Sequence, residues 1–141
     1  MSTTIESFAY GRDVTTGLTF ENAVDAAKAF LKDEGFGVLC EIDVQATLRE
    51  KLGVTFRPYR ILGSCNPTLA HRALTAEPQI GLLLPCNLVV QEIDGTTHVS
   101  AIDANAMLGV AGAGSELSPV ASDANERLGR VLERLSTQPA S

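Results

Sequence analysis

The sequence predicts an α+β fold in which helices flank a mainly antiparallel sheet. Two segments, residues 19–35 and 118–135, carry apolar side chains at the spacing of about 3.6 residues that amphipathic helices require. Shorter segments between them alternate apolar and polar residues, as half-buried strands do. Asp94-Gly95 has the composition of a tight hairpin turn between two such strands. Strands joined by hairpins or short helices favour antiparallel pairing.

A strand within residues 8–18 is expected before the first long helix. Thr19 can cap that helix, because its side-chain oxygen can accept a hydrogen bond from a free backbone N–H. Gly35 can end the helix in the left-handed conformation, with Phe36 packing back on Leu31 as in a Schellman motif. The apolar face comprises Phe20, Ala23, Val24, Ala27, Phe30 and Leu31.

The next strand is expected at residues 37–43. Its alternation puts Cys40 on the same face as Val38, so we assign Cys40 to the core. Asp43 can cap a short helix that follows, and Gly53 lies just after the end of that helix.

A further strand, residues 59–64, breaks off at a Cys-Asn-Pro sequence. Asn66 is suited to be an N-cap, and Pro67 is favoured at the first position of a helix. We therefore expect a helix from Pro67 to about Leu74.

The clearest hairpin joins residues 80–93 to residues 96–103 through the Asp94-Gly95 turn. A two-residue turn fixes the register, which places Cys86 opposite Asp103 at the open end of the core face. The other face is half polar, and it either faces solvent or forms a dimer contact. That face carries Asn87, Val89, Gln91, His98, Ser100 and Ile102.

Residues 104–115 are rich in alanine and glycine and are predicted to form a mobile loop. Ser118-Pro119 then opens a final helix. Its apolar stripe comprises Val120, Ala121, Ala124, Leu128, Val131, Leu132 and Leu135.

Composition limits the classes of function. With 141 residues, 45% of them apolar and 20% charged, we expect a single domain over residues 1–136 and a disordered tail at 137–141. A net charge of −6, no tryptophan and no basic run argue against a nucleic-acid partner. We find no membrane-spanning run or secretory signal, and three irregularly spaced cysteines are typical of a reduced cytoplasmic protein.

Two similar segments, residues 63–67 and 84–87, predict one shared site. Each places a cysteine beside an asparagine and a proline where an apolar run ends, and such residues are poor core filler. We expect the two segments to meet at one mouth of the sheet. The candidate ligand-binding residues are Cys65, Asn66, Pro67, His71, Pro85, Cys86, Asn87 and Asp103.

Each candidate also has a purely structural interpretation. Cys65 precedes a helix start, which lowers the pKa of a thiol, or it is a small apolar plug. His71 is a base or ligand reaching back toward Cys65, or a surface residue. Asp103 either raises the pKa of Cys86 or caps a turn or helix that leads into Ala104-Asn105. Glu41 is the one other acid that could point into a cleft.

The sequence matches none of the common catalytic or cofactor motifs. It has no phosphate-binding glycine loop, serine elbow, paired-carboxylate motif or Cys-x-x-Cys, and no dinucleotide fingerprint. Four zinc ligands cannot be assembled from two histidines and three cysteines at these spacings, so no structural metal site is expected. The sequence indicates no particular cofactor and does not decide whether the protein is an enzyme.

Four motifs in order resemble a known family, domain of unknown function 302. The resemblance covers roughly residues 20–105. It implies a fold similar to that of the TATA-binding protein, β-α-β4-α, with no implication of DNA binding, and it implies dimers but no established activity. The motifs are Glu34-Gly35-Phe36-Gly37-Val38; Leu62-Gly63 with Cys65-Asn66-Pro67 and Ala70; Leu84-Pro85-Cys86-Asn87 with Val89; and Val99 with Ala101, Ile102 and Asp103.

One position departs from the family pattern. Family members often have proline after the aspartate of the last motif, whereas this chain has Ala104. The segment that leaves this strand is therefore expected to differ.

Four functions are compatible with these residues. The first is a cytoplasmic, dimeric protein that binds a small polar or anionic molecule in a Cys/Asn/Pro-lined cleft, and we favour it. The second is a thiol-based redox enzyme or sensor in which Cys65 attacks and Cys86 resolves. The third is a soft-metal binder using the same two cysteines with His71. The fourth is a structural interaction module.

Overall fold

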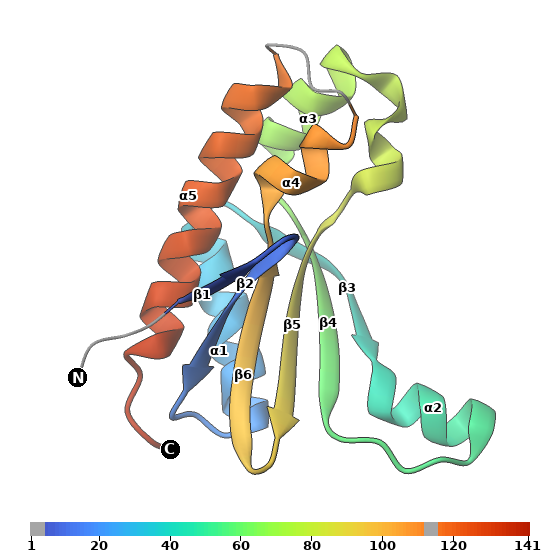
Figure 1. Ribbon diagram of the computed structural model, residues 1–141, viewed down its shortest axis with the longest axis vertical. Coiled ribbons are helices and arrows are strands. Elements are labelled where there is room, and N and C mark those ends of the chain that lie inside the picture. Colours follow the sequence, from blue (N-terminus) through green and yellow to red (C-terminus); the bar gives the residue numbers. More distant parts are fainter. Residues whose placement is uncertain (1–4, 112–115) are drawn as a thin grey trace.

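The computed structural model describes residues 5–111 and 116–141, and its α-helices and strands are labelled in Figure 1. The strands are β1 (Glu6–Phe8), β2 (Gly11–Thr16), β3 (Gly37–Asp43), β4 (Tyr59–Cys65), β5 (Cys86–Ile93) and β6 (Thr96–Ile102). The α-helices are α1 (Phe20–Asp33), α2 (Val44–Leu52), α3 (Pro67–Ala76), α4 (Ala104–Gly109) and α5 (Leu117–Ser136). A 3₁₀ helix, η1 (Pro78–Leu83), follows α3.

The six strands form one antiparallel sheet in the order β1-β2-β6-β5-β4-β3. Helices α1 and α5 lie together against one face of the sheet (Figure 1), and the core lies between these two layers. The predicted α+β class and β-α-β4-α order are confirmed, with β2 as the first strand and α5 as the last helix. The largest fully buried side chains include Val14, Leu31, Leu62, Leu88, Val99, Leu128 and Leu132.

Helix α1 begins with the predicted N-cap and ends in the predicted Schellman motif. Thr19 accepts a hydrogen bond from the Asn22 N–H at 3.3 Å. Gly35 has a φ of 85°, and the Phe36 N–H donates to the Leu31 carbonyl at 2.9 Å, which completes the Schellman motif. Phe36 is buried, so the turn also contributes to the core.

The β5–β6 hairpin has the predicted turn and register, with Ile93 paired with Thr96 and Leu88 with Ala101. The expected long first strand is wrong at its start, because residues 80–83 belong to η1. Pro78 favours a helix start, and the Glu77 side chain accepts from the Gln79 N–H and caps it.

The strand expected within residues 8–18 is confirmed as β2, and the structure adds a short strand, β1, before it. Gly11 leaves room for the Phe8 ring across the tight turn between them. The core assignment of Cys40 is wrong, because Cys40 is exposed. A bulge between Val38 and Cys40 interrupts the alternation, and Cys40 then lies against Gly63 on β4.

The end of the chain is partly as expected. The predicted loop at 104–115 is wrong over residues 104–109, which form α4, because Asp103 caps the helix by accepting from the Ala106 N–H. Residues 112–115 of that prediction lie outside the described residues. Every residue of the predicted stripe on α5 is buried. Within the described part of the chain, no helix is both long and apolar enough to cross a membrane.

Candidate functional site

A pocket of about 310 Å³ lies at the end of the sheet, where β4 stops and β5 starts. Helices α3 and α4, η1 and the first turns of α5 surround it, at the top of Figure 1. Its wall is almost entirely apolar and includes Leu69, Leu84, Met107 and Val120. Pockets that bind small molecules begin at roughly this size, about 300 Å³.

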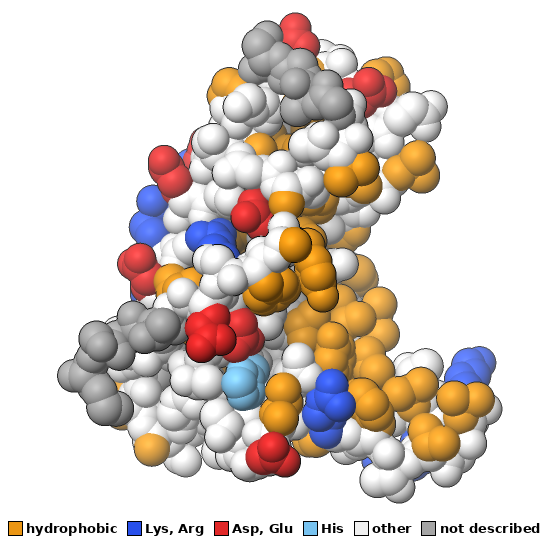
Figure 2. Space-filling view, in the orientation of Figure 1, with side chains coloured by type: hydrophobic (Ala, Val, Ile, Leu, Met, Phe, Trp, Pro, Cys, Tyr) orange, Lys and Arg blue, Asp and Glu red, His pale blue; other side chains and the backbone are white. Residues whose placement is uncertain are grey.

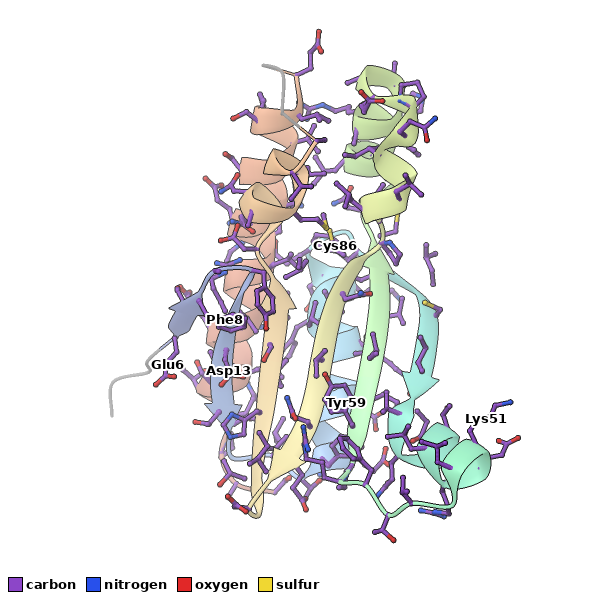
Figure 3. The ribbon with its side chains drawn as sticks, turned by 45° about the vertical axis from the view of Figure 1, so that its right-hand side comes forward. Glu6, Phe8, Asp13, Lys51, Tyr59 and Cys86 are labelled. Carbon is purple, nitrogen blue, oxygen red and sulfur yellow. The ribbon has the colours of Figure 1, made fainter. Side chains whose placement is uncertain are left out.

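The structure brings four of the eight candidate residues together in this pocket: Cys65, Asn66, Pro85 and Cys86. Strands β4 and β5 pair so that Ser64 faces Cys86, which places Cys65, the last residue of β4, beside the start of β5. Figure 3 shows Cys86 at this end of the sheet, below the helices. The two similar segments therefore meet, as the sequence predicted.

The other four candidates lie outside the pocket wall. Pro67 is exposed at the start of α3. His71 lines a separate, open hollow between α3 and the start of α5. Asn87 lines a small groove beside Phe8 on the sheet face opposite α1 and α5.

Asp103 is not opposite Cys86, so that part of the predicted register is wrong. The β5–β6 ladder ends at the Leu88–Ala101 pair, and the Asp103 N–H donates instead to the Tyr10 carbonyl at 2.9 Å. Its carboxylate accepts from Ala106 N–H at 3.1 Å and from the Asn125 amide at 3.0 Å. Asp103 is therefore the cap of α4, which forms one wall of the pocket.

Glu41 does not point into the pocket either. It forms ion pairs with Lys28 and Arg60 beside α1. The hydrogen bond from Lys28, followed by that from Arg60, lowers the pKa of the Glu41 carboxyl, so it stays charged.

The few polar side chains of the pocket are already hydrogen-bonded within the protein. Ser64 Oγ donates to the Cys86 carbonyl at 2.8 Å. Asn66 Oδ1 accepts from the Leu69 N–H at 3.2 Å, and its Nδ2 donates to the Glu34 carbonyl at 3.4 Å. A ligand in the pocket therefore meets mainly carbon and sulfur atoms.

The start of α3 offers little to an anion. Pro67 has no N–H, the Leu69 N–H is bonded to the Asn66 side chain, and the Ala70 N–H is bonded to the Asn66 carbonyl at 2.8 Å. An anion site at a helix N-terminus needs several of these donors to be free.

Burial in the pocket favours the protonated form of both thiols. Burial raises the pKa of the Cys65 thiol, so the predicted lowering by the helix start is wrong. A helix start lowers the pKa of a thiol through free N–H groups, and here the Leu69 and Ala70 N–H groups are already hydrogen-bonded to Asn66. Burial, and then the neighbouring Cys65, raise the pKa of Cys86 to about 11. The predicted direction for Cys86 is confirmed, but Asp103 is not its cause.

Sequence reasoning missed most of the pocket wall. Helix α3 carries apolar residues on two sides, with Leu69 and Ala73 buried and Leu74 half exposed at the pocket. Leu74 was the available signal in the sequence, because it is an apolar residue that lies beside the buried face of α3 rather than on it. Leu39 also lines the pocket although 69% of it is exposed, because it lies at the bulge of β3. In the described ranges, no group of three or more His, Cys, Asp or Glu residues could hold a metal ion.

Comparisons with known proteins agree with this fold. The family described as "Domain of unknown function DUF302" matches residues 12–135, which is more of the chain than the motifs alone cover. The chain is similar to the crystal structure of an uncharacterized conserved protein DUF302 from Bacillus stearothermophilus, at 33% identity and a TM-score of 0.83. That match covers 89% of this chain and 97% of the other. No curated protein matches the chain.

Proposed function

Because the chain belongs to the DUF302 family, whose description names no activity, we propose a function from the pocket itself: it binds a small, mainly apolar molecule. One observation carries the proposal. Residues from two distant segments, each with an unusual Cys/Asn/Pro composition, line one apolar pocket of about 310 Å³. Small-molecule sites are commonly apolar pockets with a few fixed polar groups.

The pocket wall favours an apolar ligand over the polar or anionic ligand that the sequence suggested. Ser64 and Asn66 use their hydrogen-bonding groups within the protein. The buried thiols contribute polarisable but uncharged surface.

The protonated state of the two pocket thiols favours a binding function over a reaction in which a cysteine attacks. An attacking cysteine requires a thiolate, and the raised pKa values of Cys65 and Cys86 keep both protonated at neutral pH. A soft-metal site would need the same deprotonation.

The proposal includes a homodimer in the reducing cytoplasm. All three cysteines are free, which suits a reducing compartment. Large hydrophobic side chains remain exposed along β3 and α2, which suits a partner surface. Sedimentation at micromolar concentration is expected to give a species of about twice 14.9 kDa, and a 14.9 kDa species alone would contradict the dimer.

Octanol and octanoate test the ligand class, because they share one chain length and differ in charge. We expect octanol to shift the NMR signals of the pocket methyl groups saturably and octanoate to do so more weakly. Ala70→Trp should abolish the effect, since Ala70 lines the pocket on α3 and is only partly buried.

His71→Trp is the matched control. His71 is exposed on the same helix and does not line the pocket, so this variant should still bind octanol. Tighter binding of octanoate than octanol would restore the anionic-ligand prediction. Failure of both probes to bind at millimolar concentration would contradict the proposed pocket.

A further inference from the structure

A hollow with exposed hydrophobic side chains runs along β3, between the α3–η1 lobe and α2. Figure 2 shows hydrophobic atoms gathered in this hollow on the right-hand side. We call it the β3 surface and define it by six residues. They are Leu39, Ile42, Leu52, Val54, Leu74 and Leu82, which are 69%, 45%, 68%, 43%, 43% and 84% exposed.

Helix α2 contacts β4, but its apolar residues are only partly covered: Val44 and Leu48 are half-buried and Leu52 is exposed. It has no buried residue over its nine positions, although Val44, Leu48 and Leu52 recur at helical spacing. Lys51, labelled in Figure 3, marks the tip of this helix, which projects from the sheet. A helix this short is only marginally stable unless its apolar face packs on something.

Strand β3 offers a free edge beside α2. It is the last strand of the sheet and pairs only with β4, so its outer backbone groups have no strand partner in the described part of the chain. It has seven residues, whereas β1 at the other edge has three. A long exposed edge is a ready template for another strand.

The direction of β3 connects this edge to the pocket. Gly37, at its start, pairs with Cys65, and Leu39 lines the pocket. Asp43, at its end, leads into α2. In a two-fold pair, the partner strand runs in the opposite direction, so its α2 lies beside the pocket end of the first copy.

Building on the proposed pocket and dimer, we propose that two copies pair along β3 and that α2 of each copy covers the pocket of the other. The site is incomplete in one chain, because the exposed leucines around its mouth are covered only when Leu52 and Val54 of a second copy pack on them.

A second copy fits this surface better than other occupants because the surface is self-complementary. The partly covered helix α2 and the uncovered pocket mouth lie at opposite ends of one edge strand, so a single two-fold axis lets each copy cover the other at both places. Charges agree as well. The last turn of α2 carries Arg49 and Lys51, and Glu77 lies at the start of η1 on the lobe that this helix would meet.

Disulfide trapping tests the predicted contact directly. Leu52→Cys and Leu82→Cys are made on separate chains in a Cys40→Ser, Cys65→Ser background, and the two are mixed and mildly oxidised. A covalent dimer should form in the mixture, and peptide mass spectrometry should find the two introduced thiols joined to each other.

Each variant alone should remain mostly monomeric on a non-reducing gel, because identical positions lie at opposite ends of the dimer. No cross-link in the mixture, or equal cross-linking of each variant alone, overturns the proposal.

Two charge variants separate this surface from the half-polar hairpin face. Leu52→Glu should convert the dimer to a 14.9 kDa species and weaken octanol binding at least several-fold. Tyr10→Glu is the matched control, because Tyr10 is 68% exposed beside the hairpin face. It should leave both properties unchanged.

The outcomes distinguish this inference from the proposed function. If Tyr10→Glu dissociates the dimer and Leu52→Glu does not, the dimer stands and this interface is wrong. If Leu52→Glu gives a monomer that binds octanol as well as the wild type does, the pocket stands and its completion by the partner is wrong.

Discussion

Cys65 and Cys86 lie in an apolar pocket, where little stabilises a negative charge on sulfur. We expect alkylation of Cys65 by iodoacetamide to reach half its maximal rate above the pH of about 8.5 that is typical of a free cysteine. Cys86 should react far more slowly, since it is buried and its pKa is raised to about 11. Peptide mass spectrometry over a pH series measures each site separately.

Exposed Cys40 provides an internal control for that experiment, because it reacts in the same molecule. Half-maximal labelling of Cys65 at a pH below about 8.5 would show a stabilised thiolate and would revive the thiol-enzyme hypothesis.

Asn66 joins the start of α3 to the end of α1. Its Oδ1 caps Leu69, and its Nδ2 reaches the Glu34 carbonyl. We expect Asn66→Ala to lower the free energy of unfolding by about 0.5–2 kcal/mol, the usual range for a lost N-cap. Urea denaturation measures this change.

Asn66→Ser is the control, because a serine hydroxyl can still cap the helix and brings no charge to this buried position, while the long 3.4 Å bond to Glu34 is lost. It should be clearly less destabilising than Asn66→Ala. Equal losses in the two variants would mean that the cap is not what stabilises this junction.

At the scale of elements, the start of α4 is held by hydrogen bonds to Asn125, and we call this pair of bonds the Asn125 clamp. Asn125 on α5 accepts from the Ala104 N–H at 2.7 Å and donates to Asp103 at 3.0 Å. Asn125→Ala should lower the free energy of unfolding by about 1–3 kcal/mol, because it leaves the Ala104 N–H without its partner and removes one of the hydrogen bonds to Asp103. Amide hydrogen exchange should rise in α4 more than in the middle of α5.

Glu126→Ala is the neighbouring control, since Glu126 is exposed on the same helix. It should change stability little and leave exchange in α4 unchanged. If Asn125→Ala has the same small effect, the clamp does not hold this wall of the pocket.

The elements that could be predicted from sequence are those whose ends depend on local chemistry. Thr19, Gly35 and the Asp94-Gly95 turn bond or bend within a few residues, so a short window contains the cause. The bulge near Leu39 could not be predicted in this way, because residues 38–40 include no glycine or proline and only the pairing with β4 reveals it.

The candidate site likewise has a part that could be predicted from the sequence and a part that could not. The meeting of Cys65 with Cys86 followed from two strand ends, which sequence can locate. The apolar wall depends on how α3, η1, α4 and α5 pack together, and no local pattern encodes that packing. The expected anion site failed for a related reason, since Asn66 and Pro67 remove the donors that a helix start would otherwise offer.

For the whole molecule, three carboxyl groups should make stability fall in acid. The hydrogen bond from Arg130, with the charges of nearby arginines, lowers the pKa of Glu34, and hydrogen bonds from Lys28 and Arg60 lower the pKa of Glu41. Burial acts to raise the pKa of Asp103, but bonds from Asn125 and backbone N–H groups outweigh it and lower that pKa as well.

A lowered pKa in the folded state gives stability that is complete above the unfolded values of about 4 and is lost as pH falls through the folded values. We therefore expect the urea midpoint to drop between about pH 5 and pH 3. Glu34→Gln should lower the midpoint at neutral pH and reduce its pH dependence. A midpoint that is flat over this range would contradict the assignment.

The order of elements along the chain also bears on synthesis by the ribosome. Strand β2 pairs with β6, with Val14 opposite Val99. This part of the sheet therefore cannot form until β6 has been translated. Helix α5 is made later still, and it supplies eight buried side chains to the core. Until residues 117–136 have emerged, the sheet lacks one of its two covering helices. A nascent chain of this protein therefore exposes an apolar face that invites chaperone binding.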